Sequence, residues 1–222
     1  GFWPGGDRDG NPYVTTQITL DVAERLRQTI LRNYYRDVRR LKRRFTFDGV
    51  QEILTRVEKR LYKHVIRSYE KINFSQKILL DELYEARAII EKNHQSLFIE
   101  ELNDFINKVR IFGFHFATLD IRQDSRVHHK AFTQIITDLL TTGDTTFPKN
   151  YHSLSEEAQI EILSLVKGNI DPSILSDEMS VSTIESIYAL KTIQQRNGER
   201  GANRYIISNN QSALNVMQTF AM

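Results

Sequence analysis

The chain has 222 residues, 40% of them hydrophobic and 26% charged, with a formal net charge of +2, which is ordinary for a globular protein with one large core or two small ones. Cysteine is absent, so disulfides, thiolate metal ligands and a cysteine nucleophile are excluded, and the composition fits a reducing compartment such as the cytoplasm. No hydrophobic run approaches the roughly 20 residues of a membrane-spanning helix, so we expect no membrane partner.

The first sixteen residues, GFWPGGDRDGNPYVTT, are predicted to form a loop, because they hold four of the chain's 10 Gly and two of its 4 Pro. Thr15 or Thr16 is the candidate N-cap of the helix that follows. Natural domains usually begin and end in exposed linkers rather than inside a loop or a hydrophobic helix. We therefore expect this sequence to be an internal fragment of a longer protein.

Residues 17–112 are predicted to be helical, because their hydrophobic residues recur at spacings of three and four. Polar caps and glycines mark where these helices begin and end. The predicted helices are residues 17–44, a segment that follows Asp48-Gly49, a segment capped by Ser75, and residues 96–112, which end at Gly113.

The hydrophobic period changes in the second half of the chain. HFATLDIRQ, at residues 115–123, alternates like a short strand with a polar end, and RYIISN, at residues 204–209, is predicted to be a second, buried strand. Between and after them we predict a helix from Ser125 to near Gly143, a helix over 153–168 with a Ser153–Glu156 capping box, and helices over 182–197 and 211–222.

These elements predict a mainly α fold with a few short strands, in a single segment. Its parts are a Gly-rich loop (1–16), helices (17–112), a strand and helix (113–143), loops and helices (144–202), and a strand with a truncated helix (203–222).

GGDRDGNP, at residues 5–12, is the first candidate site. Its alternating polar residues match the start of an EF-hand calcium loop, but Pro12 stands where that loop needs glycine and Ile18 where it needs glutamate. A phosphate-binding P-loop is excluded because no Gly-Lys-Ser/Thr follows. A structural turn held by its charged residues is the favoured interpretation, and a ligand-facing loop is the alternative. The residues concerned are Gly5, Gly6, Asp7, Arg8, Asp9, Gly10 and Asn11.

LDIRQDS, at residues 119–125, is the second candidate site. Arg122 stands near the carboxyl end of the predicted strand, where α/β folds collect active-site groups. Its planar guanidinium can hold two oxygens of a phosphate or carboxylate. The alternative is a structural ion pair between Arg122 and Asp120 or Asp124.

A basic stripe lies at residues 32–44, opposite the hydrophobic face of the first helix. Such a face can bind nucleic acid, although a solvated or salt-bridged helix face is commoner. The six histidines show neither HxxxH nor HExxH spacing, so we predict no metal site within this chain. The arginines of the stripe are Arg32, Arg36, Arg39, Arg40 and Arg43.

GGDRDGNPYVT, at residues 5–15, and FGFHFATLDIRQDSRVHH, at residues 112–129, together resemble phosphoenolpyruvate carboxylase. The family's LDIRQ block is followed by a histidine, and His128 stands at that offset. RYIISNNQSALNVM, at residues 204–217, resembles a third family block. It departs from that block at Asn209, where methionine is usual, and at Leu214-Asn215, where Ser-Asp is usual.

The resemblance implies that the chain is a slice of a helix-rich (β/α)8 barrel, and that the full-length enzyme is a cytoplasmic homo-oligomer, a tetramer. It also implies a reaction in which phosphoenolpyruvate and bicarbonate give oxaloacetate and phosphate with Mg²⁺ or Mn²⁺. No nucleic acid partner is then expected. A helical module that binds nucleic acid or protein through the basic stripe is the alternative function.

The resemblance assigns Arg122 a catalytic and substrate-binding role and makes Arg8 a weaker substrate-binding candidate. Asp7 and Asp9 would hold Arg8 and the Gly-rich loop. The family's TAHPTE-like, GYSDSxKD-like and FHGRGG-like motifs are absent from these 222 residues, and so are its metal-binding acids. We therefore expect the metal ligands to lie outside this chain and the chain alone to be inactive.

Overall fold

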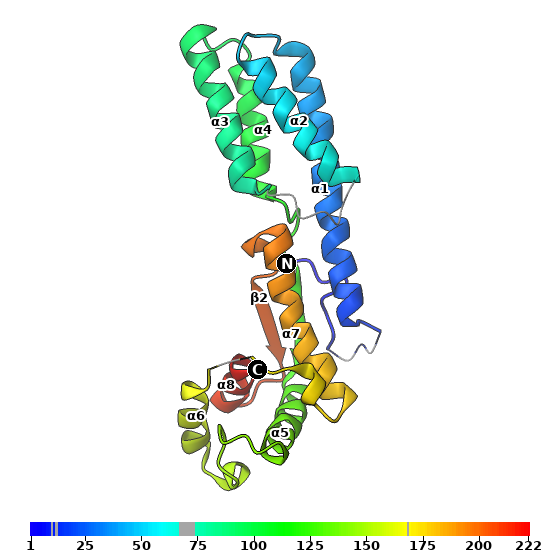
Figure 1. The fold of residues 1–222 in the computed structure, drawn as a ribbon, viewed down its shortest axis with the longest axis vertical. Coiled ribbons are helices and arrows are strands. Elements are labelled where there is room, and N and C mark those ends of the chain that lie inside the picture. The colour runs from blue at the N-terminus through cyan, green and yellow to red at the C-terminus, as the bar shows by residue number, and fades with distance from the viewer. Residues whose placement is uncertain (10, 12, 67–73, 168) are drawn as a thin grey trace. The chain divides into compact units, whose positions relative to one another are not determined.

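The computed structural model describes residues 1–9, 11, 13–66, 74–167 and 169–222. These residues divide into two compact units (Figure 1). Two helices contribute residues to both units: α1 (Thr16–Arg44) and α7 (Glu178–Asn197). None of the helices described is both long and apolar enough to cross a membrane. Unit 1 consists of residues 1–20, 119–192 and 202–222, and unit 2 of residues 21–118 and 193–201.

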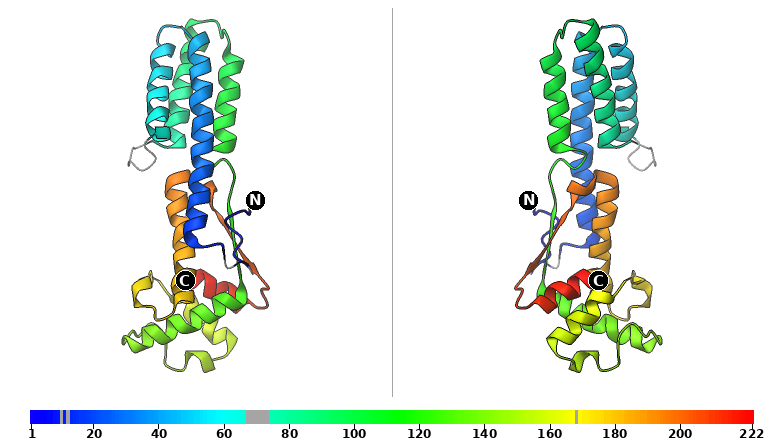
Figure 2. Two further views of the ribbon diagram at one scale, coloured as in Figure 1. Left: turned by 90° about the vertical axis from the view of Figure 1, so that its right-hand side faces the viewer. Right: turned by 90° about the vertical axis from the view of Figure 1, so that its left-hand side faces the viewer.

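Unit 2 is a bundle in which α1 lies beside three further helices (Figure 2). The hydrophobic stripes of all four helices meet in one core. Tyr34 of α1 is fully buried there, and its hydroxyl donates a hydrogen bond of 2.8 Å to the carbonyl of Gly113. The three further helices are α2 (Val50–Ile66), α3 (Gln76–Asn93) and α4 (Ile99–Phe112).

Three helix ends show the capping expected from the sequence. The Ile18 amide donates to Thr15 Oγ1 over 3.3 Å, which makes Thr15 the residue that caps α1. Ser75 caps α3 by accepting from the Ile78 amide, and α4 ends at Gly113 as predicted.

Two elements begin later than predicted, because non-glycine residues before them adopt left-handed backbone angles. Ser96 and Phe98 have φ of 58° and 59°, so α4 begins at Ile99 rather than at residue 96. Phe116 has φ of 64°, and the strand predicted from residue 115 begins only at Asp120. Hydrophobic periodicity does not report such local turns.

Unit 1 contains a parallel pair of strands, β1 (Asp120–Asp124) and β2 (Arg204–Ser208). The N-terminal segment forms parallel bridges to the other edge of β1, at Phe2 with Leu119 and at Asp7 with Arg122. A second hydrophobic core lies between the helices of this unit. These helices are α5 (Ser125–Thr141), α6 (Glu156–Leu165), residues 178–192 of α7, and α8 (Ala213–Ala221), with 3₁₀ turns at Tyr151–Ser153 and Pro172–Ile174.

Two expectations for unit 1 are wrong. The second strand is not buried: in β2, Arg204 is exposed and the other four residues are only half-buried, because β1 is its one neighbouring strand among the residues described. Helix α7 begins at Glu178 rather than at 182, because the Asp177 carboxylate accepts the amides of Met179 and Ser180 at 3.0 and 3.1 Å.

The predicted Ser153–Glu156 capping box is also wrong. Ser153 belongs to the 3₁₀ turn Tyr151–Ser153, where its hydroxyl donates to the Asn150 carbonyl over 2.7 Å. Ser155 caps α6 instead, and its Oγ accepts from the Ala158 amide at 3.4 Å. The buried side chain of Tyr151 holds the chain in the turn and so moves the start of the helix.

These two serines make a matched pair for a stability test. Replacing Ser155 with alanine is expected to lower the free energy of unfolding by about 1 kcal/mol, because the first turn of α6 loses its cap. Ser153→Ala is expected to change it by less than about 0.5 kcal/mol. Urea denaturation followed by circular dichroism measures both, and a larger loss for Ser153→Ala would contradict the observed cap.

Candidate functional site

The Gly-rich loop is hydrogen-bonded to the edge of β1. The Arg122 amide donates to the Gly6 carbonyl and the Arg8 amide donates to the Arg122 carbonyl, both over 2.9 Å. Gly6 is buried, and a Cβ at this position would collide with the backbone carbonyl of Asp120, so only glycine allows this approach. Thr19 Oγ1 fixes the other side of the loop by donating to the Gly5 carbonyl over 2.6 Å. The first two candidate sites are therefore one site.

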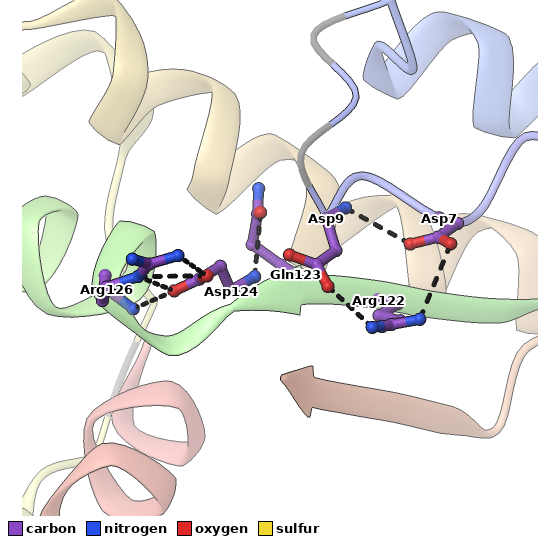
Figure 3. Close-up of polar contacts among 6 residues, drawn as sticks. All are labelled: Asp7, Asp9, Arg122, Gln123, Asp124 and Arg126. Carbon is purple, nitrogen blue, oxygen red and sulfur yellow. Dashed lines mark hydrogen bonds and ion pairs between the residues drawn. The ribbon is translucent and has the colours of Figure 1, made fainter. Parts of the chain in front are cut away.

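Arg122 is held by the carboxylates of this loop (Figure 3). Its Nη2 lies 2.7 Å from Asp9 Oδ2, its Nη1 lies 3.8 Å from Asp7 Oδ2, and its guanidinium carbon lies 5.8 Å from the centre of the Trp3 ring. The Asp9 amide donates to Asp7 Oδ1 over 3.3 Å, which orients both acids. The side chain of Arg122 is 31% exposed, so it remains open to a ligand.

Neither aspartate that was considered as a structural partner of Arg122 pairs with it. Asp120 accepts from Arg204 Nε at 2.9 Å and from Trp3 Nε1 at 3.3 Å. Asp124 pairs with Arg126. Asp120 therefore pairs across to β2, and Asp124 pairs with the first turn of α5.

Arg8 is not held by Asp7 and Asp9, which corrects the expectation for this loop. Its Nη2 donates to Ser182 Oγ over 2.7 Å, and its Nη1 donates to the Ser182 carbonyl over 3.2 Å. Burial lowers the pKa of Arg8. Arg8 therefore ties the loop to α7, and the two aspartates hold Arg122.

The remainder of the described loop makes hydrogen bonds within itself. Asn11 Oδ1 accepts from the Tyr13 amide at 3.1 Å, and the Asn11 amide donates to the Arg8 carbonyl. Gly5 has a φ of 80°, which suits glycine. Gly10, which was assigned a structural role, and Pro12 lie outside the described residues.

Asp124 and Arg126 form a second charged pair where β1 passes into α5 (Figure 3). Asp124 caps the helix by accepting from the Arg126 amide at 2.7 Å, and it also binds the Arg126 guanidinium at 2.6 to 3.1 Å. Hydrogen bonds from the Arg126 side chain lower the pKa of Asp124. Gln123 Oε1 accepts from the Asp124 amide at 3.0 Å, so consecutive side chains fix this turn.

An open hollow of about 650 Å³ lies beside these pairs, a size that suits a small-molecule ligand. The carboxylates of Asp9 and Asp124 beside the hollow are bound by arginines, and within the described ranges no cluster of three or more His, Asp or Glu side chains is placed to hold a metal ion. Among the residues that line the hollow are Asp9, Asp124, Arg126, Lys130, Gln211 and Asn215.

The buried His128 and the half-buried Tyr205 form a pair that reasoning from the sequence did not assign to the site. His128 is fully buried on α5, and its Nε2 lies 3.1 Å from the Tyr205 hydroxyl on β2. Burial, helped by the positive charge of Arg8, lowers the pKa of His128 to about 4. Burial raises the pKa of Tyr205 to about 12. The only signal in the sequence was the place of His128 in the LDIRQ block.

The buried His128 predicts a loss of stability in acid. Its pKa is about 4 in the folded chain and about 6.5 when unfolded. The unfolded chain binds a proton at His128 more readily than the folded chain does. The contribution of neutral His128 to stability is therefore lost as the pH falls from about 6.5 to about 4. We expect this loss to be about 2–3 kcal/mol.

Urea denaturation of the wild type and of His128→Gln at a series of pH values measures the effect. Asp138, whose pKa is also lowered, titrates in both proteins, so the difference between the two curves reports His128 together with its electrostatic coupling to Asp124. Parallel curves over this pH range would contradict the assignment of a neutral, buried His128.

Comparisons with known proteins agree on one family. The family model of phosphoenolpyruvate carboxylase matches residues 1–84 and 50–222. Similar proteins include phosphoenolpyruvate carboxylases of Nitrosomonas eutropha, 27% identical over 98% of this chain, and Thermosynechococcus vestitus, 27% identical over 94%. The enzyme of Aeromonas hydrophila is 28% identical over 93%. The chain spans only 25% to 27% of the length of these three relatives.

Proposed function

Because this chain belongs to the phosphoenolpyruvate carboxylase family, we propose that it is part of an enzyme that carboxylates phosphoenolpyruvate with bicarbonate, giving oxaloacetate and phosphate. In that reaction negative charge gathers on the phosphate and on the enolate that its transfer releases. Cationic groups in a preorganised site stabilise such charge. A bound Mg²⁺ or Mn²⁺ supplies further positive charge, and we assign its ligands to parts of the enzyme outside this chain.

The single observation that carries this proposal is the fixed and accessible guanidinium of Arg122. Asp9 accepts a hydrogen bond from Nη2 of Arg122, and the contact of 3.8 Å between Nη1 and Asp7 is beyond hydrogen-bond distance. Among the described residues, Nη1 and Nε have no acceptor within hydrogen-bond distance, so the N–H groups of these two nitrogens remain for an anion. We propose that Arg122 binds a phosphoryl or carboxyl group of the substrate or intermediate.

We propose an indirect role for Arg8. Its guanidinium is already bound to Ser182, and direct contact with a substrate would break those hydrogen bonds. We assign to Arg8 the positive charge beside the site and the anchoring of the loop that carries Asp7 and Asp9. The loop in turn sets the orientation of Arg122.

A coupled assay tests the proposal on the full-length protein. With phosphoenolpyruvate, bicarbonate and Mg²⁺ or Mn²⁺, oxaloacetate should form and be reduced by malate dehydrogenase with loss of NADH absorbance. No oxaloacetate from a folded full-length protein would contradict the proposed function. We further propose that the full-length enzyme is a cytoplasmic homo-oligomer, a tetramer, whose mass light scattering would report.

The 222-residue chain alone should show no turnover in the same assay. The chemistry needs the histidine, lysine and metal-binding acids of the family, and their motifs are absent from this sequence. Adding the isolated chain to the assay mixture at high concentration is the measurement. Turnover above background would show that these 222 residues hold a complete active site.

A further inference from the structure

One face of α1 carries a row of exposed arginines within unit 2. They are separated by seven, four, three and four residues, spacings that return to the same side of an α-helix. At 1.5 Å per residue the row is about 27 Å long. We call these residues the arginine row: Arg25, Arg32, Arg36, Arg39 and Arg43.

The arginine row is largely without counter-charges. Arg39 lies 3.6 Å from Glu58, but Arg25, Arg32, Arg36 and Arg43 make no ion pair with any described residue. Like charges three or four residues apart on a helix repel one another, so the row destabilises the free helix. Most other cations of the bundle are matched with an acid. These matched cations are Arg27, Arg40, Lys42, Arg44, Arg56, Arg60, Lys77, Arg87 and Lys108.

The surroundings of the row limit the width of its partner. Asp37 and Glu58 flank it, each about four-fifths buried and already paired with a lysine. A broad polyanion, such as a nucleic acid duplex, would bring phosphates against these carboxylates. A helix, with a diameter of about 10 Å, can follow the row between them. Tyr35 and the exposed Tyr62 lie together beside the row, and tyrosine and arginine are both enriched at protein interfaces.

The spacing of the row fits a second helix. A partner helix has the same rise of 1.5 Å per residue as α1. Carboxylates that recur every three or four residues along it are therefore spaced like the arginines, and the two sets stay in register over the whole contact. We propose that the arginine row of α1 docks an acidic α-helix of a protein partner. Arginine suits this role because its fork binds a carboxylate through two parallel hydrogen bonds.

The experiment measures binding of the 222-residue chain to a labelled helical peptide of about 20 residues, by fluorescence anisotropy. The peptide has glutamates at positions i, i+4, i+7 and i+11 in an alanine-rich background. A second peptide has the same composition with its glutamates spread around the helix. The ordered peptide should bind at least about tenfold more tightly, since several exposed ion pairs form together, and added salt should weaken it.

Two variants with the same change of charge separate the row from the general surface. R32Q/R36Q/R39Q/R43Q should lose at least about tenfold in affinity for the ordered peptide. K59Q/K63Q/K92Q/R110Q, which alters exposed cations elsewhere on the bundle, should keep it within about twofold. Circular dichroism checks that both variants fold.

Four outcomes would overturn the proposal. The two peptides would bind equally, the two variants would lose affinity equally, or a single-stranded or duplex oligonucleotide would bind the row more tightly than the ordered peptide does. Tighter binding of the chain to vesicles of anionic lipid than to the ordered peptide would also contradict a protein partner.

Discussion

Replacing Arg122 with alanine in the full-length carboxylase is expected to lower kcat by about 100- to 1,000-fold and leave the fold intact. The guanidinium is hydrogen-bonded to Asp9 and lies over the Trp3 ring, while Asp7, the other carboxylate beside it, is 3.8 Å from Nη1, beyond hydrogen-bond distance. A fixed cation stabilises charge that develops in the transition state without having to reorganise. Arg122→Lys should recover only part of the activity, because an ammonium group cannot reproduce the planar fork.

Arg204→Ala is the matched control for this prediction. Arg204 lies on the neighbouring strand β2 and pairs with Asp120 at 2.9 Å, so its loss weakens an ion pair between the strands. We expect this variant to melt at a lower temperature but to keep kcat within a few-fold. Steady-state kinetics and thermal melts of both variants make the comparison. If Arg122→Ala behaves like Arg204→Ala, then Arg122 is a structural residue whose function is to hold the Gly-rich loop.

Replacing Tyr34 with alanine is expected to lower the free energy of unfolding by about 3–5 kcal/mol. Its ring is fully buried in the core of unit 2 and packs edge-on against Phe105 at 5.7 Å between centroids. Truncation leaves a cavity and also removes the hydrogen bond to Gly113 at the end of α4. Tyr34→Phe keeps the ring and should cost about 1–2 kcal/mol, because the buried carbonyl of Gly113 loses its partner.

The control for Tyr34 is a tyrosine on the surface of the same bundle. Tyr84 of α3 is 41% exposed, and Tyr84→Ala should change the free energy of unfolding by less than about 1 kcal/mol. Urea denaturation with a fixed m-value compares the three variants. Equal losses for Tyr34→Ala and Tyr84→Ala would contradict the described core.

The helices of unit 2 could be predicted from the sequence, because the buried face of each helix requires hydrophobic residues at regular spacing. Each helix buries one face, and residues on that face recur every three or four positions. The observed bounds of α1 and α3 therefore lie close to the predicted ones. Capping by Thr15 and Ser75 depends only on residues a few positions away. The start of α6 was predicted wrongly, because the spacing of Ser153 and Glu156 matches a capping box although Ser153 lies in a 3₁₀ turn beside the buried Tyr151.

The site was predictable in its members but not in its pairing. The motifs identified Arg8 and Arg122, and the strand placed Arg122 near its carboxyl end. Which acid binds which arginine depends on the register between the loop and β1, and that register joins Asp9 to a residue 113 positions away. The sequence offered only the nearby acids Asp120 and Asp124 as ion-pair partners of Arg122, because it does not show the register between the loop and β1. His128 and Tyr205 are likewise separated by 77 positions and meet only in the folded unit.

The order in which the two units are completed during synthesis follows from how the chain is divided between them. Nearly all of unit 2 is one continuous stretch, residues 21–118, so its helices can pack as soon as that stretch has left the ribosome. Unit 1 is assembled from three separated stretches. Asp120 of β1 emerges 84 positions ahead of Arg204, its partner on β2, and in that interval one edge of β1 has no strand to pair with. An unpaired edge invites pairing with another chain, so the nascent protein is most in need of a chaperone between the emergence of β1 and that of β2.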